Sequence, residues 1–160
     1  MLVCAEPGNP HPHESYPGDS PDLLLESAYD HAYTCFKTGT DLFHRNIRHI
    51  LALCFPGTTF DEQMRRAWIT NSVLCSARTE GGQVPAIVAR TCRSLYLDKQ
   101  IQLFPQAVVA ALGKKAQERL TGLPREVVAA VAAAPPGCNH RTARPSWQCI
   151  ADQVHERSFA

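Results

Sequence analysis

Apolar residues in this chain occur in two kinds of pattern, short continuous runs and longer stretches with helical spacing. The short runs are typical of buried strands, which we expect over residues 2–5, 68–73, 107–112 and 127–133. The helical spacing predicts helices over residues 21–38, 42–54, 87–101 and 147–157. A capping-box pattern from Thr59 to Glu62 and the turn at Gly113 predict two shorter helices, over 59–66 and 114–120.

Strands and helices alternate along the whole sequence. Such alternation favours a parallel sheet covered by helices on both faces, because each parallel connection needs a crossover. We therefore expect an α/β fold, a three-layer α/β/α sandwich with a central four-stranded parallel sheet. The length of 160 residues fits one domain over residues 1–160.

Composition narrows the class of protein. No apolar run approaches the roughly 20 residues needed to span a bilayer, so no membrane partner is expected. Seven cysteines without an export signal favour reduced thiols or metal ligands, and therefore a cytoplasmic protein. We also expect the protein to be a monomer. The net charge of +1 gives no overall attraction to a polyanion, although basic clusters occur at 65–66, 114–119 and 141–144.

Two polar residues stand where strands are expected to end. Asn71 lies near the end of the second apolar run, and Glu6 opens the loop Glu6-Pro7-Gly8 after the first. Ligands of open α/β sheets bind at the carboxyl ends of strands. The amide of Asn71 can both accept and donate, which matches the neighbouring carbonyl and N–H of a uracil. The alternative is that each residue only caps a local turn.

Four segments in order resemble the uracil-DNA glycosylase superfamily, in particular its iron–sulfur-type bacterial branch in a divergent or shortened form. They are Ala-Glu-Pro-Gly, Trp-Ile-Thr-Asn-Ser-Val-Leu-Cys, Leu-Gly-Lys-Lys and Ala-Ala-Pro-Pro-Gly-Cys-Asn-His. The segment Thr-Cys-Arg-Ser-Leu-Tyr-Leu around Cys92 lies between the second and the third and also contributes to the resemblance. The resemblance implies a DNA repair enzyme that hydrolyses the N-glycosidic bond of uracil or a related damaged base in DNA. The alternatives are a member of the superfamily that binds a nucleobase or nucleic acid without catalysis or is differently specialised, and an unrelated α/β hydrolase or nucleotide binder. No Gly-x-Ser-x-Gly motif supports the hydrolase.

The resemblance also assigns roles around the base. Asn71 would read its edge, Tyr16 would stack on it, and Pro7 and Gly8 would line its loop. Glu6 would orient the attacking water.

Other positions would stabilise charge or hold DNA. Gly113, Lys114 and Arg141 would bind DNA phosphate. The fourth segment departs from the family pattern, because its usual histidine is absent from residues 135–137. Asn139 or His140 would then stabilise the leaving base, unless residues 143–146 are the displaced motif.

Two cysteines match ligand positions of an iron–sulfur cluster in one subgroup of the family. They are Cys75 and Cys92, and a cluster needs about four ligands. We therefore expect no cofactor in this chain as given and an iron–sulfur cluster only in a longer form with two further cysteines. Packing of two thiols in an apolar environment is the alternative.

Overall fold

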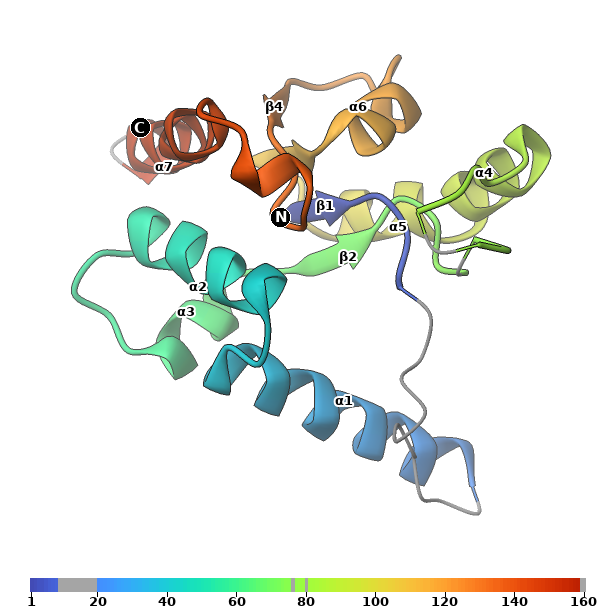
Figure 1. The fold of residues 1–160 in the computed structure, drawn as a ribbon, viewed down its shortest axis with the longest axis horizontal. Helices are drawn as coiled ribbons and strands as arrows, with labels where there is room; N and C mark the ends of the chain where they lie inside the picture. Colours follow the sequence, from blue (N-terminus) through green and yellow to red (C-terminus); the bar gives the residue numbers. More distant parts are fainter. Residues whose placement is uncertain (9–19, 76, 80, 159–160) are drawn as a thin grey trace.

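The sheet is four-stranded and entirely parallel. The computed structural model describes residues 1–8, 20–75, 77–79 and 81–158. Its strands lie in the order β2-β1-β3-β4 (Figure 1). Their bounds are β1 (Leu2–Cys4), β2 (Ile69–Asn71), β3 (Val109–Leu112) and β4 (Val127–Ala130). The predicted α/β class and parallel sheet are confirmed, and each strand lies inside its expected range but is shorter.

Seven α-helices lie in the described part of the chain. They are α1 (Pro21–Thr38), α2 (Leu42–Cys54), α3 (Phe60–Arg66), α4 (Ala86–Cys92), α5 (Asp98–Leu103), α6 (Lys114–Leu120) and α7 (Ala143–Ser158). A π-helical turn over Arg93–Leu97 joins α4 to α5, so the expected long helix over 87–101 is present with a local widening. None of the described helices combines the length and apolar composition that crossing a membrane requires.

Helix ends follow the local chemistry of the sequence. The Ser20 hydroxyl accepts from the backbone N–H of Leu23 at 3.3 Å at the start of α1. Gly39 ends that helix with φ 68°, a left-handed conformation that glycine adopts without strain. The predicted start of the last helix at 147 was wrong, because α7 begins at Ala143. Pro145 lies in its first turn, where a missing N–H breaks no helical hydrogen bond.

Alternate strand residues pack on opposite sides of the sheet. Leu2 and Cys4 join a core with Ile47 of α2 and Trp147 of α7. Val3 joins a second core with residues of α5 and α6, among them Leu120. Residues of helices therefore pack against both sides of the sheet.

Helix α1 is set apart from the rest of the molecule. It has no buried residue, and its ribbon runs along the outside of the fold (Figure 1). Its aromatic contacts come from the second half, where Tyr33 lies 5.6 Å from Phe60 and Phe36 lies 5.9 Å from Phe43, ring centroid to ring centroid. The first half exposes apolar side chains, and Leu25 is 71% exposed.

Candidate functional site at the carboxyl edge of the sheet

The carboxyl ends of β1 and β2 bring the two predicted site residues to one edge. Cys4 is the register partner of Asn71 in the parallel ladder. The ladder continues past both strands, because the N–H of Ser72 donates to the Cys4 carbonyl at 2.8 Å. Glu6, two residues after Cys4, therefore lies at the same edge as Asn71.

The Asn71 carboxamide has no hydrogen-bond partner among the described residues. The residue is half-buried. Residues two apart in a strand face the same side. Ile69 packs against the core beneath α2, so Asn71 lies on the α2 side of the sheet. One acceptor and two donors are thus available at a strand end.

The Glu6 carboxylate is enclosed by cations and is not free. Lys115 Nζ donates to one carboxylate oxygen, and Arg119 Nη1 donates to the other at 2.6 Å. The Glu6 side chain is only 6% exposed. Burial opposes its ionisation, but the hydrogen bonds and charges of Lys115 and Arg119 outweigh burial and lower its pKa below 4.5. Glu6 is therefore an anion whose two oxygens are already engaged.

The same two cations connect Glu6 to its surroundings. Arg119 Nη1 also donates to the Ala5 carbonyl at 3.0 Å and to Ser72 Oγ at 3.1 Å. Ser72 Oγ in turn donates to the Ala5 carbonyl at 2.6 Å. These bonds join the ends of β1 and β2 to α6, which lies on the side of the sheet opposite to α2.

Lys115 extends this network to a loop. Its Nζ donates to the carbonyl of Gly81 at 2.9 Å and to that of Gly82 at 2.6 Å. We call Glu6, Lys115, Arg119 and Ser72 the Glu6 network. The sequence analysis assigned no pairing to Lys115 or Arg119, although their spacing of four residues on a short helix places both on one face.

Gly113 and Lys114 lie where β3 turns into α6. Gly113 has φ 93°, and a Cβ added there would lie 3.0 Å from the Cβ of Ala132. The glycine is thus required by a close approach of two backbones. Lys114 is exposed and forms no ion pair or hydrogen bond with the described residues. It is accessible to an anion at this edge.

The loop after β4 does not bring its polar residues to Glu6 or Asn71. Asn139 and His140 are exposed, and His140 Nδ1 accepts from the backbone N–H of Thr142 at 3.3 Å. His140 thus stabilises the turn that precedes α7. Arg141 is exposed, and no bond among the described residues joins it to the strand ends.

The two cysteines at predicted cluster-ligand positions differ in their exposure. Cys75 is exposed and Cys92 is buried. Within residues 1–8, 20–75, 77–79 and 81–158, no group of three or more His, Cys, Asp or Glu side chains could hold a metal ion. Pro7 is half-buried and Gly8 is exposed beside Glu6, whereas Tyr16 lies outside the described residues.

Comparisons with known proteins add no family assignment. No family model matches the chain, and neither the curated proteins nor the solved structures include a match.

Proposed function

We propose that the chain binds a uracil-type base of DNA at the carboxyl edge of its sheet and hydrolyses the bond between that base and its sugar. The observation that carries the proposal is the free carboxamide of Asn71 at the end of β2, beside the loop that follows β1. This arrangement agrees with the resemblance to uracil-DNA glycosylases. It supports base reading more directly than it supports hydrolysis.

Base reading depends on the chemistry of the amide. A uracil presents a carbonyl and an N–H side by side, and Asn71 can satisfy both at once. A base must leave the DNA stack to reach such a site. The exposed Lys114 follows the end of β3, at the same edge of the sheet, and supplies a positive charge for DNA phosphate.

Hydrolysis makes a further demand on Glu6. A carboxylate that orients water must have an oxygen free to accept its hydrogen bond. Glu6 would have to release Lys115, whose side chain is 34% exposed, before it could play this role.

A second candidate function is binding of the base without hydrolysis. The pairing of both Glu6 oxygens favours it, as does the position of Glu6 on the α6 side while Asn71 lies on the α2 side. In this case the Glu6 network only holds the strand ends in place for Asn71.

A uracil-containing oligonucleotide tests both functions. Removal of the base is measured as alkali-labile strand cleavage, and binding is measured by fluorescence anisotropy against the same oligonucleotide with thymine. We expect Asn71→Asp to weaken removal or binding of uracil by roughly 100-fold, since an ionised carboxylate cannot donate and leaves a buried group unpaired. Asn71→Ala should lose the preference for uracil without gaining another.

The outcomes separate the candidates. Cleavage that depends on Asn71 supports the glycosylase. A preference for uracil without cleavage supports the binding function. Neither cleavage nor a preference for uracil over thymine would contradict the base-reading role.

A further inference from the structure

The outer face of α2 carries a concentration of basic side chains. Arg45, Arg48 and His49 follow one another at helical spacing, on the side away from the buried Ile47 and Ile50. The loop before α3 and α3 itself complete a hollow of about 350 Å³. Its lining comprises Arg45, Arg48, His49, Ala52, Thr58, Phe60 and Gln63. This set contains cationic, polar and aromatic groups but no carboxylate.

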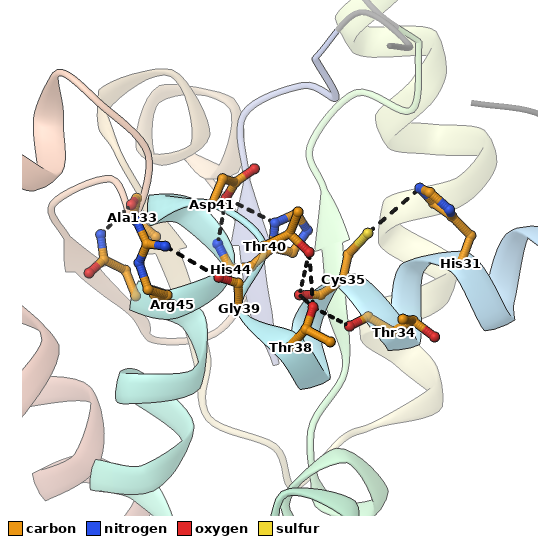
Figure 2. Close-up of polar contacts among 11 residues, drawn as sticks. His31, Thr34, Cys35, Thr38, Gly39, Thr40, Asp41, His44, Arg45 and Ala133 are labelled. Atoms are coloured by element: carbon orange, nitrogen blue, oxygen red, sulfur yellow. Dashed lines mark hydrogen bonds and ion pairs between the residues drawn. The ribbon is translucent and has the colours of Figure 1, made fainter. Parts of the chain in front are cut away.

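The two arginines carry charges that no described acid pairs. Neither forms an ion pair with any described residue. Arg45 Nη1 donates to the Gly39 carbonyl at 3.4 Å, at the end of α1, as Figure 2 shows. The Arg48 guanidinium lies 5.7 Å from the centroid of the Phe60 ring. Each guanidinium has five N–H donors, so most of them remain available to a ligand.

The carboxylates on neighbouring elements are occupied elsewhere. Asp41 accepts from the His44 N–H at 2.9 Å (Figure 2), and Asp61 pairs with Lys37 at 3.3 Å. Glu62 accepts from the backbone N–H of Thr59 in the capping box. None of these acids lines the hollow, and none forms an ion pair with Arg45 or Arg48.

The basic surface continues toward the loop after β4. The His49 ring lies 6.2 Å from the ring of Trp147, and the Arg144 guanidinium lies 5.3 Å from the same ring. Asn46 Nδ2, next to Arg45 in sequence, donates to the Ala133 carbonyl at 2.8 Å. This bond ties the buried side of α2, and not its basic outer face, to the loop that leaves the sheet.

We propose that this hollow binds a phosphate group through Arg45, Arg48 and His49. Guanidinium groups bind phosphate oxygens through paired N–H donors, and the imidazole adds a further donor. The phosphate belongs to a DNA backbone or to a free nucleotide, which share this chemistry. The inference deepens the proposed function and rests on it where the phosphate is that of DNA, since it adds a backbone contact away from Asn71.

A uracil-free oligonucleotide tests the site apart from base reading. Binding of fluorescein-labelled oligothymidylate is measured by anisotropy over a range of NaCl concentrations. Loss of one phosphate contact should lower the slope of log K against log salt by about 0.7 for a single strand. We expect this slope change for Arg48→Gln, together with roughly fivefold weaker binding at low salt. The double variant, Arg45→Gln with Arg48→Gln, should show about twice the slope change.

Arg66→Gln is the matched control. Arg66 is also an exposed arginine stacked on an aromatic ring, 4.2 Å from the centroid of Phe55, but it does not line the hollow. Arg66→Gln removes the same charge as Arg48→Gln but outside the hollow. It should therefore leave the affinity and the salt slope nearly unchanged. Equal losses for Arg48→Gln and Arg66→Gln would reduce the effect to overall charge and overturn the proposal. Thermal melting checks that each variant is folded.

A second arm identifies the source of the phosphate. Inorganic phosphate and thymidine monophosphate are titrated while the His49 ring signals are followed by NMR. One outcome assigns the hollow to a free phosphate compound. In it, the His49 signals shift to saturation in the wild type but not in Arg48→Gln, while Arg48→Gln binds oligothymidylate as tightly as the wild type does. No dependence on Arg48 in either arm overturns the site, while loss of uracil preference in Asn71→Ala would still uphold base reading.

Discussion

Two basic regions of this molecule use their charges in opposite ways. On α6, Lys115 and Arg119 close around Glu6, and both carboxylate oxygens are engaged. On α2, Arg45 and Arg48 face a hollow and meet no carboxylate in the described part of the chain. The first pair of cations stabilises the fold at the strand ends. The second pair is available to something outside the protein.

The difference shows that a count of basic residues does not predict a binding surface. Both regions appear as basic clusters along or near a helix, and only the position of the acids separates them. A cation that is already paired with a buried acid gains little from a new anion, whereas an unpaired guanidinium gains a partner.

Removing Glu6, the acid that pairs with Lys115 and Arg119 of α6, should have the largest effect on stability. Glu6→Gln leaves Arg119, with a side chain only 15% exposed, without its counter-charge. We expect the free energy of unfolding in urea to fall by about 3 kcal/mol, the lower end for breaking a buried ion pair. Glu126→Gln is the control, since its pair with Arg157 spans 3.5 Å and is largely exposed, and its loss should cost under about 1 kcal/mol. Equal losses in the two variants would remove the distinction between the regions.

Acid should weaken the paired region in a defined direction. The pKa of Glu6 is lowered in the folded state, so the unfolded chain binds more protons between the two pKa values. The contribution of Glu6 is complete above about pH 4.5 and is lost as the pH falls toward the folded pKa. The difference in unfolding free energy between wild type and Glu6→Gln should therefore narrow from pH 6 to pH 3. A constant difference would mean that the charge of Glu6 does not cause its stabilising effect.

Lys115 should contribute less to global stability and more to one loop. Lys115→Met keeps the pair between Glu6 and Arg119 but removes the bonds to Gly81 and Gly82. We expect about 1–2 kcal/mol of destabilisation, as for hydrogen bonds to a charged group, and faster protease cleavage around Gly81. The neighbouring exposed Lys114, replaced by Met, should change neither measurement.

The smallest effect on stability should come from the unpaired region. Arg48→Gln removes a charge with no ion-pair partner among the described residues, so the unfolding free energy should change by less than about 0.5 kcal/mol. The same variant should weaken oligonucleotide binding, which makes the contrast with Glu6 complete. A fall of several kcal/mol in the free energy of unfolding in urea would show that Arg48 stabilises the fold and is not an unpaired side chain available to a ligand.

Local patterns in the sequence predicted most of the fold. The four strands were identifiable as short apolar runs, and the capping box at Thr59 was correct. The widening at 93–97 was not predicted, because α-helical spacing was assumed throughout, whereas the π-helical turn buries Cys92 and Leu97 at a spacing of five residues.

The site was less predictable than the fold. The sequence indicated that Glu6 and Asn71 would lie at strand ends, because position along a strand is a local property. It could not indicate that Lys115, 109 residues away, would form an ion pair with Glu6, since such a contact depends on how α6 packs. The hollow on α2 was missed for the same reason, because Phe60 and Gln63 complete it from another helix.

The isolation of α1 has a consequence for how the molecule opens. No residue of this helix is buried, and its contacts with α2 and α3 come from Tyr33, Phe36 and Lys37 in the second half. Amide protons near Leu25 should therefore exchange with solvent through a local fraying event, at a small fraction of the global unfolding free energy. Protection of the amide protons from exchange should rise along the helix toward Thr38, so that α1 unwinds from its Pro21 end while the sheet stays intact.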